Sequence, residues 1–203
     1  MLMATELPEP VAAAIAGLAS GEKPPIASAY ASLQDAVLGG PGCLRFDPPR
    51  KVAWADAAWG EFVALLAHEN NHVRSIAGQM LSNLAPSVDH DTALRDLPVV
   101  ISATRDPMFV TARHILQALW KYALDDAVLR DRLLAELAHR FQDSAAEKNC
   151  TLIRFDIVSG LRTLYDRSGD PAVTQTARQL ISLEGDDKYR KKYAAVWRGV
   201  GDA

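Results

Sequence analysis

The sequence predicts an all-α protein built from helices in pairs, and three observations lead to this class. Apolar residues recur three and four positions apart along almost the whole chain, which is the spacing of one helix face. No segment shows the alternation of β-branched residues between turn signals that is typical of strands. An arginine also returns at the same place in successive helices about every 40 residues, which indicates a repeated helical hairpin.

The first two helices are expected at residues 9–19 and 25–38. The stretch SGEKPP ends the first helix, and proline in the first turn suits the start of the second. Residues 39–50, GGPGCLRFDPPR, are rich in glycine and proline and predict a loop. We expect an N-terminal hairpin with its Gly/Pro loop at 1–50 and a repeat region with a C-terminal capping helix at 51–203, as one continuous domain.

Four further pairs of helices follow, and their short joints carry turn and capping residues. Two joints contain the same dipeptide, Asp106-Pro107 and Asp170-Pro171. Each is expected to start a helix, because aspartate caps the free amides and proline occupies the first turn. The expected helices are 53–67 and 71–84, 92–103 and 107–123, 127–141 and 146–166, and 171–183 and 187–197.

The repeat is carried by Arg74, Arg113 and Arg154, which lie near the start of the second helix of their pairs, 39 and 41 residues apart. The segment NNHVRSIAGQMLSNLA resembles the second helix of a HEAT repeat, with its Val-Arg pair, a small residue and leucines. DPAVTQTARQLISL is similar, but Thr174 stands where the arginine would be. The resemblance to the HEAT/armadillo class covers about residues 52–183. It implies a right-handed α-solenoid of HEAT-like hairpins, which is a fold rather than a function.

The composition bounds the functional class. Of the 203 residues, 49% are hydrophobic and 23% charged, which is enough for a packed core, and the net charge of −3 argues against binding nucleic acid through overall charge. The first twenty residues lack a basic n-region, and no apolar run approaches the ~20 residues that span a bilayer. Cys43 and Cys150 have no metal-ligand spacing and are expected to be free thiols, so we predict a cytoplasmic protein without membrane contact.

The segment from His68 to His72 matches H-E-x-x-H, the zinc signature of metallopeptidases, in which both histidines share one helix and Glu69 would be the general base. The two asparagines between them, Asn70 and Asn71, favour a helix joint. If the helix continued instead, both histidines would lie opposite its apolar face, with no third ligand at the usual spacing. We interpret the match as accidental and predict no metal, no cofactor and no catalytic residue.

Two roles are open for the repeat arginines, which fall on the same flank of their helices. They form either a row along the concave face that binds carboxylates or phosphates, or a ladder in which each bonds an acid or carbonyl of the neighbouring repeat. In the first case Gln117 and Lys121, one and two turns after Arg113, extend the polar edge of the same helix.

The C-terminal segment DDKYRKKYAAVWR mixes five basic residues with Tyr189, Tyr193 and Trp197, which are four residues apart. One interpretation is a nucleic-acid contact, where charge and stacking cooperate. The other is a terminal capping helix that buries its aromatic stripe and exposes its charges. Trp120, within an apolar stripe, is expected in the core.

We therefore predict a non-catalytic interaction module, a scaffold that binds a protein or peptide along its concave face. The predicted contact residues are Arg74, Arg113, Gln117, Lys121 and Arg154. The alternative is a nucleic-acid-binding protein similar to the HEAT-like DNA glycosylases, which grip the nucleic-acid backbone in a basic concavity. The sequence leaves the oligomeric state open.

Overall fold

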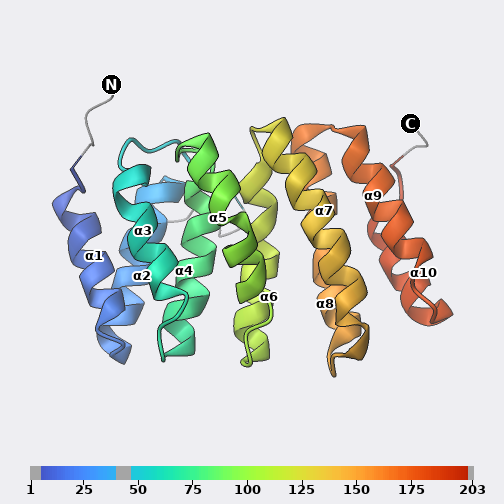
Figure 1. The fold of residues 1–203 in the computed structure, drawn as a ribbon, viewed down its shortest axis with the longest axis horizontal. Coiled ribbons are helices and arrows are strands. Elements are labelled where there is room, and N and C mark those ends of the chain that lie inside the picture. The colour runs from blue at the N-terminus through green and yellow to red at the C-terminus, as the bar shows by residue number, and fades with distance from the viewer. Residues whose placement is uncertain (1–5, 40–46, 201–203) are drawn as a thin grey trace.

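The computed structural model describes residues 6–39 and 47–200, and throughout these residues the secondary structure is helical without a strand (Figure 1). The predicted all-α class is therefore confirmed. Residues 40–46 of the predicted loop, including Cys43, lie outside the described residues, and Cys150 is a free thiol. The helices are α1 (Glu9–Ala19), α2 (Lys23–Leu38), α3 (Ala55–Leu65), α4 (Asn71–Leu84), α5 (His90–Ala103), α6 (Phe109–Ala118), η1 (Leu119–Ala123), α7 (Ala127–Asp143), η2 (Ser144–Ala146), α8 (Cys150–Ser168), α9 (Pro171–Ser182) and α10 (Asp187–Val196).

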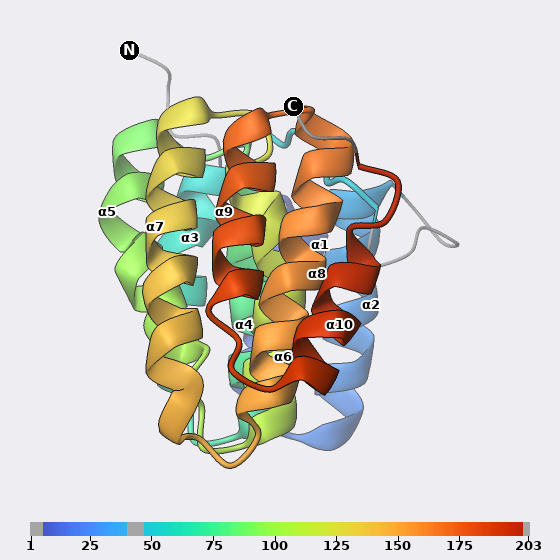
Figure 2. The same cartoon turned by 90° about the vertical axis from the view of Figure 1, so that its right-hand side faces the viewer.

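The helices form two layers along the long axis of the molecule, which Figure 2 shows end-on. The odd layer consists of α3, α5, α7 and α9, in which α7 contacts both α5 and α9. The even layer consists of α2, α4, α6, α8 and α10, each in contact with the next even-numbered helix. Helix α1 packs on α2 at the N-terminal end. Among the described helices, none combines the length and hydrophobicity needed to cross a bilayer.

The core lies between the two layers and is continuous from α1 to α10. Trp59 and Trp120 are both buried, as predicted for Trp120. The Trp59 indole donates to Asp96 Oδ2 at 2.8 Å, and the Tyr122 hydroxyl donates to the Ala93 carbonyl at 2.7 Å. The polar ends of these large side chains are therefore satisfied inside the fold, as burial requires.

Helices α4 and α6 of the even layer approach each other closely at Gly78. A Cβ atom on Gly78 would lie 2.6 Å from Cγ1 of Ile115, a distance that real Cβ contacts do not show. Glycine at this position lets the Ile115 side chain lie directly on the backbone of α4. This contact places α6, with Arg113 and His114, firmly against α4.

The predicted helix starts differ from the structure by two residues at α2, α3, α5 and α6 and by four at α8, and the last two of these starts lie on one edge of the molecule. The helix expected at 107–123 begins at Phe109 and changes to a 3-10 turn at Leu119, and the helix expected at 146–166 begins at Cys150. At the first of these starts, Asp106 is not the N-cap residue of α6, and its Oδ1 is shared between Arg74, which bonds both carboxylate oxygens, and the Met108 amide.

The last helix, α10, has the burial expected of a capping helix. Tyr193 and Trp197 are buried, and the Tyr193 hydroxyl donates to the Thr151 carbonyl at 2.8 Å. Lys191 and Lys192 on the outer side of the helix are exposed. The aromatic stripe therefore packs against the preceding hairpin while the charged residues face water.

Candidate interaction face

The H-E-x-x-H segment crosses the joint between α3 and α4, which confirms the predicted break. His68 precedes α4 and His72 lies inside it, so they do not share a helix face. Asn70 caps α4 by accepting the His72 amide at 2.9 Å, and His68 Nδ1 accepts the Asn70 amide at 3.0 Å. His68 Nε2 lies 3.3 Å from the Ala19 carbonyl. His68 thus organises a joint, and among the described residues no three histidine, cysteine, aspartate or glutamate side chains gather as a metal site.

The repeat arginines bond acidic residues of the following hairpin. Arg74 holds both oxygens of Asp106, with Nε–Oδ2 at 2.5 Å and Nη2–Oδ1 at 3.0 Å. Arg113 holds Asp156 in the same bidentate way, at 2.6 and 2.9 Å. Each pair spans two hairpins, so it fixes how one hairpin sits against the next.

Arg154 makes the third rung of this ladder, and its Nη1 donates to Glu184 at 2.9 Å. A further rung, which the sequence analysis missed, joins Arg130 of α7 to Asp170 through Nε–Oδ2 at 2.8 Å. Arg130 lies on α7, the first helix of its pair, so the recurrence of arginine on the second helices does not include it.

The carbonyl groups of the joints complete the ladder. Arg74 Nη1 donates to the carbonyls of His68 and Glu69, both at 2.8 Å. Arg130 Nη1 donates in the same way to Ala123 and Leu124, at 3.0 and 3.1 Å. Arg74 and Arg130, each near the start of a helix, therefore bond the carbonyl groups of the joint before that helix and also an acid of the next hairpin.

The ion pairs shift the protonation equilibria in the direction of the charged forms. The hydrogen bond with Asp106 raises the pKa of Arg74, against the opposing effect of burial. Burial acts to raise the pKa of Glu184, but the Asp186 amide and Arg154 outweigh it, so the pKa lies below its ordinary value. The positive charges of the row are thus balanced within the fold.

The predicted contact residues differ in how much they reach the surface. The Arg113 side chain is 31% exposed, against 16% for Arg74 and 13% for Arg154. Gln117 donates to Asp156 Oδ1 at 3.1 Å and so joins the Arg113 pair. The structure therefore brings Arg113 and Gln117 together around the carboxylate of Asp156. Arg74 and Arg154 lie elsewhere, where they bond acids in the α5–α6 and α9–α10 joints.

Lys121 does not lie on this polar edge, in contrast to the expectation from helical spacing. It is 1% exposed, and its Nζ donates to Asn83 Oδ1 at 2.9 Å. The reason is the change of winding after Ala118, where α6 passes into a 3-10 turn. A 3-10 turn advances ~120° per residue rather than ~100°, so the α-helical extrapolation from Arg113 points to the wrong side.

A chain of polar side chains across α2, α4 and α6 was also missed. The Tyr30 hydroxyl donates to Gln79 Oε1 at 2.9 Å, and Gln79 Nε2 donates to Ser75 Oγ at 3.2 Å. Ser75 Oγ in turn lies 3.2 Å from His114 Nδ1. The chain joins three helices, so no motif within one helix could have indicated it.

These side chains line a pocket of about 230 Å³ together with Ile26, Ala27, Ile76 and His72. Small-molecule sites usually have ~300–1,000 Å³, so this volume suits one side chain of a partner rather than a cofactor. The pocket lies in the even layer, between α2, α4 and α6.

Comparison with known protein families, curated proteins and solved structures finds no relative of this chain. The functional conclusion therefore depends on the geometry of the even layer and its ion pairs.

Proposed function

We propose that this chain is a non-catalytic interaction module, a right-handed α-solenoid of HEAT-like hairpins that binds a protein or peptide along the even layer. Support for the architecture comes from the two layers, in which each even helix contacts the next. The arginine-to-acid pairs that recur between successive hairpins add to it. Stacked repeats use such nearest-neighbour contacts to build one extended surface.

The observation that carries the proposal is the cluster of Arg113, Gln117 and Asp156 between α6 and α8. Asp156 is buried, and Arg113 is the most exposed of the three repeat arginines. Its bonds to Asp156 use Nε and Nη2, and Nη1 makes no hydrogen bond within the part of the chain that the structure describes. A charge-balanced guanidinium with a spare donor suits a peptide carbonyl.

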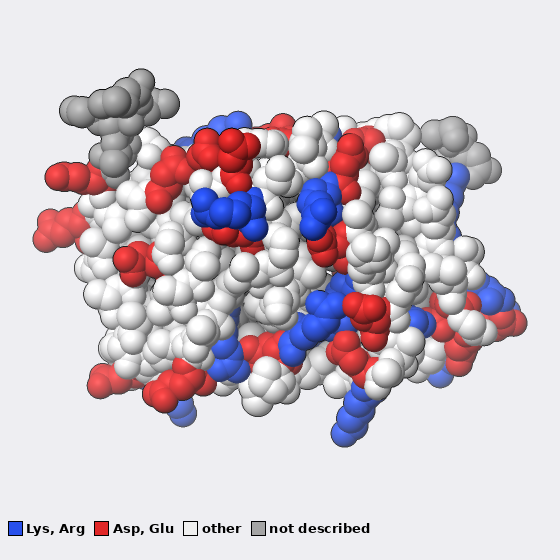
Figure 3. Space-filling model, in the orientation of Figure 1, with Lys and Arg blue, Asp and Glu red and all other residues white. Residues whose placement is uncertain are grey.

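Charge balance also separates the two candidate partners. Binding of a nucleic acid depends on cations that neutralise phosphates, and the repeat arginines already face carboxylates. The face in Figure 3, formed largely by the odd layer, shows basic groups beside acidic ones on a mostly uncharged surface. In the even layer, the carboxylates that already face the repeat arginines favour a protein partner.

Nucleic-acid binding is the second candidate function, and one observation favours it. Lys188, Lys191, Lys192 and Arg198 are all exposed on or beside α10. A cluster of this kind attracts a phosphate backbone, and the resulting affinity would fall steeply with salt.

The proposal can be tested by selecting peptides from a displayed random library with the full chain and measuring their affinity by fluorescence anisotropy. Arg113→Lys keeps the charge opposite Asp156 but loses the planar bidentate fork, and with it the Nη1 group at its position. We expect it to weaken the selected peptides by roughly tenfold or more, as loss of a charged hydrogen bond does. Arg132→Lys on α7, where the exposed Arg132 pairs with Glu136, is the matched control and should change nothing.

The same assay with labelled DNA and RNA decides between the candidates. If oligonucleotides bind with an affinity that falls with salt, and no selected peptide depends on Arg113, the result favours nucleic-acid binding as the function. A library that yields no Arg113-dependent peptide removes the even layer as the binding face.

A further inference from the structure

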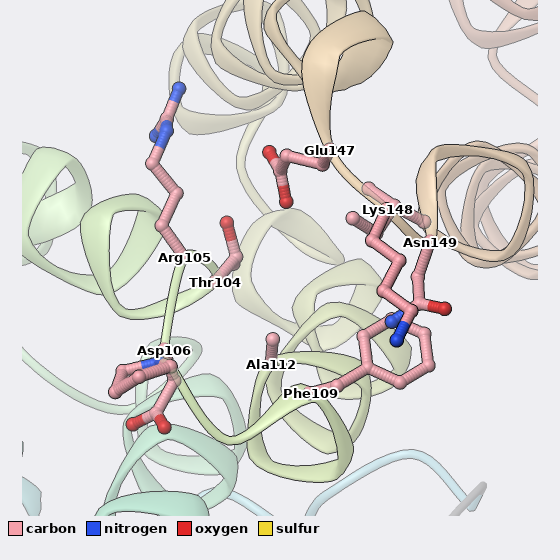
Figure 4. Close-up of a pocket in the computed structure, with 10 residues that line it drawn as sticks. Thr104, Arg105, Asp106, Phe109, Ala112, Glu147, Lys148 and Asn149 are labelled. Atoms are coloured by element: carbon pink, nitrogen blue, oxygen red, sulfur yellow. The ribbon is translucent and has the colours of Figure 1, made fainter.

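The joint between α5 and α6 separates two surface pockets at one end of the helices. The α8-side pocket, about 410 Å³, lies between this joint and the start of α8 (Figure 4). The α3-side pocket, about 380 Å³, lies between the joint and the end of α3. Both pockets are lined by Arg105, Asp106 and Pro107, so these residues form a ridge with a pocket on either side.

Apolar side chains line both pockets and also stand exposed around them. The α8-side pocket has Phe109, Ala112 and Ile153, and the α3-side pocket has mainly aliphatic side chains: Val63, Leu66, Ala67, Val99 and Ala103. Met108, next to the ridge, is 51% exposed, and Val99 and Val110 are also exposed. Exposed apolar groups that cluster in this way mark contact surfaces.

The charged groups of the α8-side pocket are nearly all paired inside the fold. Glu147 is held by the fully buried Arg140, with Nη1–Oε1 at 2.5 Å and Nη2–Oε2 at 3.1 Å. Arg105 pairs with Asp143 at 2.6 Å. Asp106 is already neutralised by Arg74 of the ladder.

Lys148 is the exception, because it is exposed and forms no ion pair with any residue that the structure describes. In Figure 4 its side chain runs from the start of α8 toward Phe109, whereas Arg105 points away from the pocket. The lining therefore has one surplus positive charge beside an apolar floor.

We propose that this edge binds a segment of a partner protein with two apolar side chains, one for each pocket, and an acidic residue that meets Lys148. The partner's two apolar side chains lie on either side of the Pro107 ridge and remove the apolar lining of both pockets from water. The carboxylate of the acidic residue supplies the negative counter-charge for the ammonium group of Lys148. This inference rests on the proposed function for the kind of partner, and it adds a second surface, at the helix ends, to the even layer.

The test uses fluorescent peptides that carry two leucines at varied separation and one glutamate, with copies in which lysine replaces the glutamate. The full chain should bind the glutamate peptides, and the lysine copies should bind roughly tenfold more weakly. Lys148→Glu should reverse this preference. Lys191→Glu, a change of the same charge on the exposed side of α10, should leave it unchanged.

A second pair of variants tests the α3-side pocket. Ala67→Trp places an indole in that pocket from an exposed position, and it should weaken every glutamate peptide by roughly tenfold or more. Ala64→Trp, also exposed on α3 but outside the lining, should not. If neither Lys148→Glu nor Ala67→Trp changes the affinity for the glutamate peptides, the inference is overturned.

The outcomes also separate this inference from the proposed function. If the glutamate peptides fail to bind while library peptides bind through Arg113, the proposed binding at the edge is wrong and the proposed binding at the even layer is supported. If the glutamate peptides bind and no selected peptide depends on Arg113, the proposed binding at the edge is supported and the proposed binding at the even layer is wrong. Failure of both sets removes both surfaces.

Discussion

The two Asp-Pro joints of this protein have the same sequence and different structures. At Asp170-Pro171 the aspartate caps α9 through Oδ1, which accepts the Ala172 amide at 2.9 Å, and the proline is the first helical residue. At Asp106-Pro107 the Oδ1 atom accepts the Met108 amide at 2.8 Å, yet α6 begins only at Phe109. The second joint leaves Pro107 and Met108 outside the helix, at the edge where the two pockets lie.

The arginine that meets each aspartate accounts for the difference. Arg130 uses one oxygen of Asp170, Oδ2, which leaves Oδ1 to the helix start. Arg74 uses both oxygens of Asp106, so Oδ1 is shared between a guanidinium and an amide. The Asp-Pro dipeptide therefore starts its helix at the proline where the arginine leaves one carboxylate oxygen to the helix amides, as at Asp170.

The largest expected effect comes from Asp106→Asn, because the Asp106 side chain is 5% exposed and faces the charged Arg74. Asparagine keeps the shape but leaves the guanidinium without a counter-charge. We expect a loss of about 3 kcal/mol in the free energy of unfolding, measured with urea and circular dichroism, as for other buried pairs. Asp143→Asn, which breaks the exposed pair with Arg105, is the control and should cost less than ~1 kcal/mol. Equal losses in the two variants would contradict this account.

Asp170→Asn should cost less, about 1–2 kcal/mol, by the same measurement. The Asp170 side chain is 24% exposed, and asparagine retains the capping oxygen for the Ala172 amide. Only the ion pair with Arg130 is lost. A loss as large as that of Asp106→Asn would mean that the two joints do not differ in the way proposed.

The pH dependence of this second loss sharpens the comparison. The Arg130 hydrogen bond, together with the Ala172 amide, lowers the pKa of Asp170 below its ordinary value near 3.8. A depressed folded-state pKa adds stability that is present above the ordinary value and is lost as the pH falls through the folded value. The difference in Tm between wild type and Asp170→Asn should therefore shrink between pH 7 and pH 3. Asp131→Asn, at an exposed position of α7, serves as the reference, and a gap that widens in acid would refute the sign.

Met108→Ser should have the smallest effect on stability. Met108 stands two residues after its aspartate, where Ala172 stands in the other joint, but Ala172 packs against the core while Met108 is half exposed. We expect a change of less than ~0.5 kcal/mol in the free energy of unfolding. The same variant should weaken the glutamate peptides several-fold if the edge binds them, which separates its role in binding from stability.

Several features were predictable because they depend on neighbours in sequence. The 3.6-residue period of apolar side chains placed the helices, and the start of α4 at Asn71 and of α9 at Pro171 followed from local capping chemistry. The Asn70-Asn71 pair predicted the break in the zinc-like motif for the same reason. The recurrence of Arg74, Arg113 and Arg154 pointed to a ladder or a row without deciding between them.

Tertiary structure alone decided the partners of these residues. Asp106 lies 32 residues from Arg74 and Asp156 lies 43 from Arg113, so each meets its arginine only when hairpins stack. The same stacking buries Lys121 beside Asn83, which is 38 residues away, and joins Tyr30 to Gln79 across 49 residues. Periodicity fixes which face of a helix is apolar, because that depends on 3.6 residues per turn. Which charges are neutralised, and which, like Lys148, form no ion pair among the described residues, depends on contacts between segments that are distant in sequence.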